Sequence, residues 1–332
     1  MTDLRRVPDR AAPECDAGAA ASQFAADVQY YLVQDPRQLP SRYLYDDLGS
    51  ALFEAICRLP WYGITRAEER LLVRHGSDVF RLAAPVTTIV ELGPGNGEKI
   101  RMLIEAGGAA APRVQVHLVD VSSSALESAG RMLARLEHVH LSTHQAGYEA
   151  GLREVAAERA SGDRMLLLFL GSNIGNFDPP GTNAFLSAVR RELAAGDWLL
   201  MGADLVKPEP DLLLAYDDPL GVTAAFNRNL LVRINRELRG TFDIDQFVHR
   251  AVWAANDSRV EMHLVARRAM EIRIEAAGLE LAMRRDEPIW TESSYKYRPE
   301  EVTGLLERAG FQPVAQWLDH ADQFALSLVQ AA

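Results

Sequence analysis

Three alternating glycines, Gly93, Gly95 and Gly97, follow a short apolar segment, and a helical pattern begins directly after them in ELGPGNGEK (91–99). In a doubly wound sheet the ligand lies at the carboxyl ends of the strands, and the first turn from strand to helix must let it approach the backbone. Glycine has no side chain to obstruct that approach. The turn therefore predicts a nucleoside ligand, and by itself it leaves open a dinucleotide or S-adenosylmethionine (SAM).

Acidic residues around the turn bear on the choice between these two ligands. The dinucleotide fingerprint is G-x-G-x-x-G, whereas this chain has G-x-G-x-G followed directly by Glu98, which would repel a pyrophosphate. Glu91 ends the preceding apolar segment, where it could pair with the ammonium group of a methionine-type ligand. Asp120 ends the next apolar segment and could accept hydrogen bonds from ribose hydroxyls in either ligand, or simply cap a helix. The E-x-G-x-G-x-G pattern resembles the first motif of class I SAM-dependent methyltransferases.

Polar clusters follow several further segments. Asn176, in FLGSNIGNF (169–177), comes after the most apolar strand-like run and could orient a substrate amine, although asparagine is also common in turns. AYDD (215–218) and TESSYKY (291–297) combine hydroxyls with carboxylates, which suits a small polar substrate but also solvated loops and helix caps. Met262 is more typical of a core than of a ligand contact. The residues alone leave these roles open.

Composition limits the partners. The chain has 35 Lys and Arg against 46 Asp and Glu, with a net charge of -11 and no basic run, so we expect no nucleic acid partner. Two cysteines exclude a disulfide scaffold, and the histidines, with His138 and His140 on one face of a strand-like segment, lack zinc-site spacing, so we expect no metal. No segment is typical of a signal peptide or a membrane span. We expect a cytoplasmic monomer that acts on a small molecule.

From Thr87 to Asp204, short apolar strands alternate with amphipathic helices. This alternation is typical of a mostly parallel sheet covered by helices on both faces, and it predicts a doubly wound α/β fold. Upstream, Thr65 and Glu68 form a T-x-x-E pattern, which predicts that they cap the start of the next helix.

The remainder of the chain has a different texture. A helical pattern over 226–238 and strand-like stretches over 260–266, 270–274 and 324–329 indicate a separate α+β unit. Residues 1–22 mix Pro, Ala, Asp and Arg without periodicity, and we expect them to form a loosely ordered leader.

Several longer segments, read together, resemble the L-histidine Nα-methyltransferases of ergothioneine biosynthesis. In chain order these are YLYDDLGSALFEAICRLPWYGITRAEERLL (43–72), ELGPGNGEK (91–99), FLGSNIGNF (169–177), DLVK (204–207), AYDDPLGVTAAFNRNLL and INREL (215–238), VEMHL (260–264) and TESSYKY (291–297). The resemblance extends from about Tyr43 to Val329. It implies a Rossmann-like SAM-binding domain, which we place at 69–204, and a substrate domain built from both chain ends, 23–68 plus 205–332.

The resemblance also implies ligand contacts. Positions for the methyl donor fall on Tyr45, Gly93, Lys99 and Asp120. The family's Asp-Phe pair beside the adenine falls on Gly147 and Tyr148, so the aromatic is kept in kind and the carboxylate is absent. Positions for the amino acid fall on Tyr62, Gly171, Asn176, Tyr216, Met262, Glu292 and Ser294.

Roles for the amino-acid contacts follow from their chemistry. We expect the hydroxyls of Tyr62 and Tyr216 to donate to the substrate carboxylate and Asn176 to orient the amine. Glu292 and Ser294 would hydrogen-bond the imidazole, and a buried Glu292 would disfavour side chains that cannot donate to it.

The implied reaction is SAM-dependent Nα-methylation of histidine, with three transfers giving trimethylhistidine (hercynine). Tyr45 could accept or relay the amine proton, and water is an equal candidate. Three alternatives stay open at this point: methylation of another amino acid or amine such as tryptophan, an NAD(P)-dependent oxidoreductase, and a SAM-binding module without catalysis.

Overall fold

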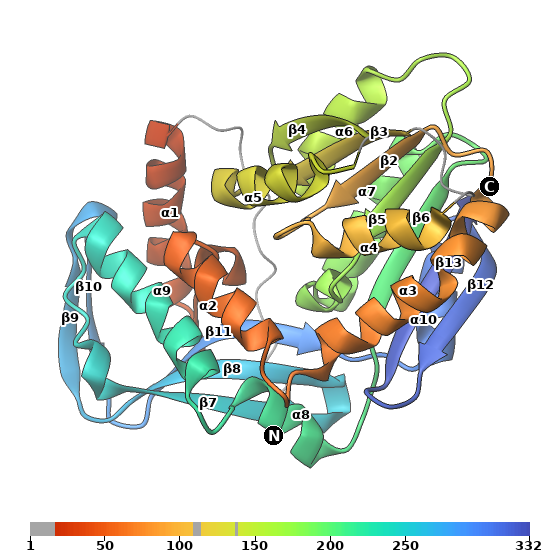
Figure 1. Ribbon diagram of the computed structural model, residues 1–332. Coiled ribbons are helices and arrows are strands. Elements are labelled where there is room, and N and C mark those ends of the chain that lie inside the picture. Colours follow the sequence, from red (N-terminus) through yellow and green to blue (C-terminus); the bar gives the residue numbers. More distant parts are fainter. Residues whose placement is uncertain (1–16, 109–113, 137–138) are drawn as a thin grey trace. The chain divides into compact units, whose positions relative to one another are not determined.

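The computed structural model describes residues 17–108, 114–136 and 139–332, and the chain forms two compact units. Unit 1 consists of the chain up to Tyr62 together with Lys207–Tyr295, and unit 2 consists of Gly63–Val206 together with Lys296–Ala332 (Figure 1). Each unit therefore combines segments that are far apart in the sequence. Within the described ranges, no helix has both the length and the hydropathy of a membrane span.

Unit 2 is built around a seven-stranded sheet in the order β12-β13-β6-β5-β2-β3-β4. Its strands are β2 (Thr88–Leu92), β3 (Val114–Asp120), β4 (Val139–Gln145), β5 (Met165–Phe169), β6 (Trp198–Asp204), β12 (Phe311–Asp319) and β13 (Phe324–Ala331). Strands β2 to β6 are parallel, and β13 runs antiparallel to both β6 and β12. The central strands β2 and β5 are buried at every position, which explains their nearly continuous apolar sequences.

Helices cover both faces of this sheet, as the alternation predicted (Figure 1). One face carries α3 (Gly63–Ala83), α4 (Glu98–Gly107) and α5 (Ser123–Leu133), and the other carries α6 (Tyr148–Ala157), α7 (Pro179–Glu192) and α10 (Pro299–Arg308). The predicted doubly wound α/β fold is confirmed.

The chain order of the strands creates a switch point in the sheet. From β2 the chain adds β3 and β4 on one side, and it then places β5 and β6 on the other side. In open α/β sheets, ligands bind outside the carboxyl ends of the strands at such a point. The turn after β2 and the loop after β5 both lie there.

The domain boundaries differ from the predicted ones. The second domain was expected to include all of 205–332, but 296–332 belongs to unit 2 because β13 pairs along its length with β6. An apolar strand pattern does not specify which strand will be its partner. At the other boundary, α3 is continuous from Gly63 to Ala83, so 63–68 also belongs to unit 2.

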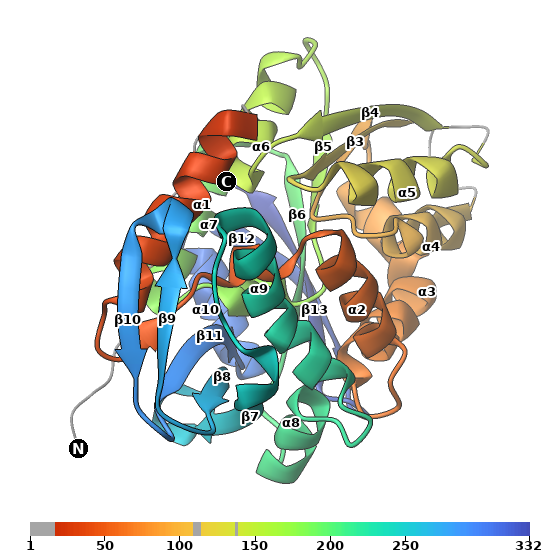
Figure 2. The same cartoon turned by 90° about the vertical axis from the view of Figure 1, so that its left-hand side faces the viewer.

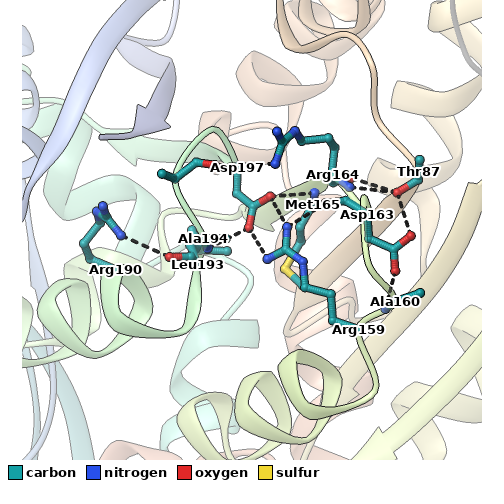
Figure 3. A network of polar contacts seen from close by, with 11 residues as sticks. Thr87, Arg159, Ala160, Asp163, Arg164, Met165, Arg190, Leu193, Ala194 and Asp197 are labelled. Carbon is teal, nitrogen blue, oxygen red and sulfur yellow. Dashed lines mark hydrogen bonds and ion pairs between the residues drawn. The ribbon is translucent and has the colours of Figure 1, made fainter.

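A buried carboxylate joins the amino ends of β5 and β6. Asp197, fully buried, accepts bonds of 2.6 Å from both Nη atoms of Arg159 and bonds of 3.0 and 2.9 Å from the backbone N–H groups of Met165 and Ala194 (Figure 3). Arg159 and Ala194 lie in the segments that precede the two strands, and Met165 is the first residue of β5. The network fixes the amino edge of the sheet, opposite the switch-point turns.

Unit 1 contains a four-stranded sheet in the order β1-β11-β8-β7 and a β9-β10 hairpin. Its strands are β1 (Arg37–Gln38), β7 (Phe247–Ala254), β8 (Arg259–Ala266), β9 (Met270–Ile274), β10 (Leu279–Met283) and β11 (Pro288–Tyr295). Its helices are α1 (Ala17–Leu32), α2 (Asp47–Cys57), α8 (Glu209–Tyr216) and α9 (Val222–Leu238). Helix α9 packs on β7 and β8, and α2 packs on α9 (Figure 2). The predicted α+β character is confirmed.

The predicted leader over 1–22 is wrong at its end. Helix α1 begins at Ala17, six positions before the expected onset of order at Gln23. The segment AGAAA is rich in alanine, the strongest helix former, and this local propensity extends the helix even though no apolar periodicity marks it. Residues 1–16 lie outside the described ranges.

Candidate active site

The glycine turn after β2 has three positions with three different surroundings. Gly93, Gly95 and Gly97 have φ of 74°, 55° and 80°, in the left-handed region. A Cβ at Gly97 would lie 2.9 Å from Cα of Ala129 in α5, so close helix packing requires glycine there. A Cβ at Gly93 would lie 3.0 Å from Oη of Tyr148, whereas Gly95 has nothing within 4 Å. The open side of the turn is therefore at Gly95, where a ligand can approach the backbone.

Glu91 is buried one residue before the end of β2. Its Oε2 has no hydrogen-bond partner in the part of the chain that the structure describes. Burial raises its pKa to about 8, with Glu68 and Asp120 adding to the increase and Lys99 opposing it. A buried carboxyl oxygen without a partner fits a cationic ligand group, as the predicted pairing with an ammonium requires.

Asp120 ends β3 and also lies at the carboxyl edge. Its Oδ1 accepts a bond of 2.9 Å from the backbone N–H of Ser122, and burial raises its pKa. The charges that act on the Glu91 carboxyl are one ammonium, that of Lys99, and two further carboxyl groups, those of Glu68 and Asp120. This excess of acid favours a cationic ligand and disfavours a pyrophosphate.

The adenine positions expected from the resemblance lie at the start of α6. Gly147 is the N-cap residue, and its side-chain direction is open, with nothing within 4 Å of a Cβ. Tyr148 packs against Phe169 and Phe185, with ring centroids 5.5 and 6.1 Å apart, and burial raises the pKa of its hydroxyl. The structure thus places an aromatic ring beside Gly93 and leaves room where the family's carboxylate is missing.

The predicted capping role of Thr65 and Glu68 is wrong. Helix α3 begins at Gly63, so Thr65 lies inside its first turn. Fully buried Glu68 instead binds Nζ of Lys99 at 2.6 Å and accepts the backbone N–H of Gly171 at 2.9 and 2.8 Å. The sequence did not indicate this role, because the same T-x-x-E pattern occurs when the glutamate caps a helix and when it makes a tertiary contact.

The loop after β5 holds Gly171 and Asn176 in an unusual backbone conformation. Gly171 and the next residue, Ser172, both have positive φ, 77° and 59°, and the 3-10 turn Asn173–Asn176 follows. Oγ of Ser172 accepts the backbone N–H of Asp204 at 2.9 Å. Non-glycine residues adopt this region rarely, and they concentrate where surrounding structure holds them for function. The structure therefore supports this loop as part of the site.

A second buried ion pair lies next to that loop. Lys296 and Asp204, both almost completely buried, lie 2.9 Å apart, and Tyr297 donates from its hydroxyl to the carbonyl oxygen of Ile174 at 3.2 Å. These contacts join the loop to the end of β6 and to the segment after β11. The sequence signal was present in DLVK and TESSYKY, but no role was predicted for either charged residue.

In unit 1, three predicted substrate residues share one buried sheet face. Glu292 in β11 is directly opposite Met262 in β8, and Ser294 lies two residues further on the same side. Their exposed fractions are 6%, 2% and 5%. Tyr216 donates from its hydroxyl to Oγ of Ser294 at 2.8 Å, and the ring of Tyr62 lies 6.2 Å from that of Tyr216. Five of the predicted residues are therefore gathered in this unit.

The bond between Tyr216 and Ser294 differs from the predicted role of Tyr216. Its single hydroxyl hydrogen points to Ser294, so donation to a substrate carboxylate would require this bond to open. His249 holds the backbone of the same residue, because its Nε2 lies 2.7 Å from the carbonyl oxygen of Tyr216. The Nδ1 of His249 lies 2.9 Å from Nδ2 of Asn227. Burial lowers the pKa of His249, which favours a neutral ring that accepts from Asn227 and donates to Tyr216.

Tyr45 lies in unit 1, whereas the other donor positions lie in unit 2. Its ring contacts Phe53 and Phe226, each with centroids 5.5 Å away, and Phe53 is also 6.2 Å from the ring of Tyr62. Tyr45 and Tyr62 thus border the same phenylalanine.

The histidine pair singled out from the sequence includes His138, which lies outside the described ranges. Among the described residues of unit 2, another pair of histidines lies close together. His117 and His144, on neighbouring strands, could together with Glu158 reach a metal ion. Their ring nitrogens lie 2.9 Å apart, and the second nitrogen of His144 lies 3.1 Å from a carboxylate oxygen of Glu154. With suitable tautomers, a chain of N–H donors runs from His117 through His144 to Glu154. The expected absence of a metal stays a prediction.

The order of the strands, the glycine turn and the acidic residues at the carboxyl edge define a class I SAM-dependent methyltransferase. The chain belongs to the family of histidine-specific, SAM-dependent methyltransferases, whose family model matches residues 24–331. This membership excludes the NAD(P)-dependent oxidoreductase.

Named relatives agree with the family. The chain is 41% identical over 313 residues to the histidine N-alpha-methyltransferase of Mycolicibacterium smegmatis, covering 94% of this chain and 96% of that protein. It is 40% identical over 314 residues to the protein of the same name from Mycobacterium tuberculosis, with the same coverage of 94% and 96%. It is 28% identical over 297 residues to ergothioneine biosynthesis protein 1 of Neurospora crassa, covering 89% of this chain and 33% of that protein.

Proposed function

We propose that this protein methylates the α-amino nitrogen of L-histidine with SAM as donor, and that three successive transfers give hercynine for ergothioneine biosynthesis. Family membership and the mycobacterial relatives support this substrate. The observation that carries the proposal is the buried face on which Met262, Glu292 and Ser294 lie together. We further propose a monomer in the cytoplasm that requires no metal.

The residues of unit 2 fit the donor. Glu91 would hold its ammonium group, Asp120 its ribose hydroxyls, and Tyr148 would lie beside its adenine. The glycine turn and Lys99 complete the set of donor contacts. When bound, SAM supplies a methyl group on a positively charged sulfur, which needs no further activation by the protein.

The residues of unit 1 fit the amino acid. Imidazole has one N–H donor and one acceptor nitrogen in its neutral form. The Glu292 carboxylate would accept from the N–H, and the Ser294 hydroxyl would complement the other nitrogen. A buried carboxylate left without a donor is costly, so Glu292 would select against apolar side chains. Tyr62 would bind the substrate carboxylate, joined by Tyr216 when its bond to Ser294 opens.

Catalysis then depends on placement. Orientation of two bound reactants can contribute about 7–11 kcal/mol to lowering a barrier. Asn176 and Gly171 would orient the amine, which must lose a proton before each transfer so that its lone pair is available. A trimethylated nitrogen has no lone pair, so the reaction stops after the third transfer.

Two proton acceptors are compatible with this scheme, the Tyr45 hydroxyl and water. The variant Tyr45→Phe separates them in steady-state kinetics. If Tyr45 relays the proton, kcat falls about 10²-fold, at the lower end of general-base effects, while the affinity for histidine is unchanged. An unchanged kcat assigns the proton to water.

The substrate is tested by mass spectrometry after incubating the purified protein with SAM and each standard amino acid in turn. The expected result is a gain of three methyl groups on histidine alone. Methylation of tryptophan or another amino acid instead would overturn the assignment of Glu292 while keeping the donor site. Donor binding without any methyl transfer would indicate a SAM-binding module.

A further inference from the structure

Glu68 makes buried contacts with Lys99 and Gly171 that the sequence did not predict. Its side chain is completely buried, and both of its oxygens are used. Oε2 pairs with Nζ of Lys99 at 2.6 Å, and the backbone N–H of Gly171 lies 2.8 and 2.9 Å from Oε2 and Oε1. A buried carboxylate is tolerated only with such partners. One side chain of α3 therefore holds the first turn of α4 and the loop after β5 together.

The surrounding chain leaves space for this carboxylate and little else. A Cβ at Gly202, inside the central strand β6, would lie 1.9 Å from Oε1 of Glu68. Glycine weakens a strand interior and often marks a close approach of another group. At Gly171, a Cβ would lie 3.1 Å from Nζ of Lys99. Both glycines thus make room for the contact between Glu68, Lys99 and the loop.

Helix stability does not explain the position of Lys99. It is the second residue of α4, at the positive end of the helix dipole, where a cation is unfavourable. Its side chain is 23% exposed and points to a fully buried carboxylate. The pair with Glu68 offsets this unfavourable position, and it holds the ammonium 3.1 Å from the place that a Cβ at Gly171 would occupy.

We propose that Glu68 is a positioning residue that couples the donor half of the site to the acceptor half. The proposal rests on the proposed function, in which Lys99 contacts the methyl donor and Gly171 the amino acid. When the donor binds, it fixes the position of Lys99. Because Glu68 is bonded to both Lys99 and the backbone N–H of Gly171, the position of Gly171 is fixed as well. Donor and amino acid thereby raise each other's affinity.

The test is a pair of calorimetric titrations of histidine, with and without saturating S-adenosylhomocysteine, which occupies the donor site without turnover. In the natural protein, histidine is expected to bind at least about 5-fold more tightly when the donor site is filled. In Glu68→Gln, the amide keeps the volume but presents N–H groups to Lys99 or Gly171. The ratio of the two affinities should then fall to within about 2-fold of one.

Kinetics supply a second readout. Loss of a hydrogen bond to a charged group corresponds to about 10- to 100-fold, and this loss is expected in kcat/KM for histidine, mainly through KM. The matched control is Asp197→Asn, the same change at a buried carboxylate of the same unit. It should lower the melting temperature without changing the ratio of affinities.

If Glu68→Gln does not fold, Lys99→Gln is measured instead, because the Lys99 side chain is partly exposed. The proposal expects weaker binding of both S-adenosylhomocysteine and histidine in that variant. Weakening of S-adenosylhomocysteine alone would overturn it, as would an unchanged affinity ratio in folded Glu68→Gln or a ratio near one in the natural protein. If another amino acid proves to be the acceptor, the titrations use that amino acid, so a wrong substrate is distinguished from a wrong role for Glu68.

Discussion

Two buried carboxylates in unit 2 lie at opposite edges of one sheet, and each is compensated for its burial by a cation and by one or more backbone N–H groups. Asp197, at the amino edge, is surrounded by Arg159, by the backbone N–H of the first residue of β5 and by a backbone N–H from the loop before β6 (Figure 3). Glu68, at the carboxyl edge, is surrounded by Lys99 and the backbone N–H of Gly171. Both are completely buried and both have a cationic partner.

The difference lies in what the partners do. Every contact of Asp197 closes a connection between strands, so the network is complete without a ligand. The partners of Glu68 lie in the first turn of α4 and in the loop after β5, at the carboxyl edge, and nearby Glu91 still has an oxygen without a partner in the described ranges. A buried ion pair is therefore informative about function only together with its place in the sheet, because ligands bind at the carboxyl edge.

The largest expected effect is on stability at the amino edge. Asp197→Asn leaves Arg159 without its charge partner, and breaking a buried pair in this way costs about 3 kcal/mol of unfolding free energy. Chemical denaturation measures the change, and steady-state kinetics on the folded variant should give kcat/KM for histidine within about 2-fold of the natural value. A large loss of kcat/KM in this variant would contradict the conclusion that the carboxylate at the amino edge serves stability alone.

The same contrast can be tested in unit 1 with Glu292→Leu. If this carboxylate serves the substrate, kcat/KM for histidine falls about 100-fold and the preference moves toward apolar amino acids. The control is Ser293→Ala on the opposite face of β11, where the buried hydroxyl has no hydrogen-bond partner among the described residues. The control should be neutral in both activity and stability, and equal losses in the two variants would assign Glu292 a structural role.

Glu91 provides a test of the carboxyl edge that depends on pH. Its pKa is raised to about 8 by burial, so the carboxyl is mostly protonated at pH 7, and it must ionise to pair with an ammonium. Binding of S-adenosylhomocysteine, which keeps that ammonium, should therefore release a proton and tighten up to about 10-fold per pH unit from pH 6 until it levels off near pH 8.

Calorimetry in two buffers of different ionisation enthalpy measures the released proton. In Glu91→Gln the pH dependence should disappear and the affinity at pH 8 should fall about 10-fold, while the unfolding free energy at pH 7 changes little because a neutral group replaces a neutral group. An affinity that weakens as pH rises would exclude the proposed pair.

The smallest expected effect is a gain. Gly147 is the N-cap of α6 with φ of −67°, and its side-chain direction is open. Gly147→Asp supplies a better cap, worth a few tenths of a kcal/mol over glycine, and restores the family's carboxylate beside the adenine. Donor affinity should rise about 3-fold in calorimetry, whereas Gly147→Ala should not increase it. If Gly147→Asp stabilises the protein without raising donor affinity, the new carboxylate caps α6 and does not contact the donor.

The sequence predicted the doubly wound sheet, the glycine turn and the positions of Glu91 and Asp120 correctly as local features. Strand and helix periods are read within one segment, and the turn after the first strand of such a sheet has a known place. The grouping of Met262, Glu292 and Ser294 was expected only from the resemblance, since residues in β8 and β11 become neighbours through strand pairing.

Non-local contacts were the source of several corrections, whereas the early start of α1 has a local cause. Residues 296–332 joined unit 2 because β13 pairs with β6, and α1 began earlier because alanine-rich sequence needs no apolar stripe to be helical. Glu68 was taken for a cap, and His249 received no role, because their partners Gly171 and Tyr216 are distant in the sequence.

What the sequence by itself determined is the class of fold and the chemistry available at the end of each strand, because both follow from short-range pattern and residue type. Only the tertiary structure decided which buried charges lie at the carboxyl edge of the sheet, where ligands bind such sheets, and which lie at the amino edge. Glu68 and Asp197 are both acidic residues, and the pairing of distant segments gives Glu68 partners at the carboxyl edge and Asp197 partners at the amino edge.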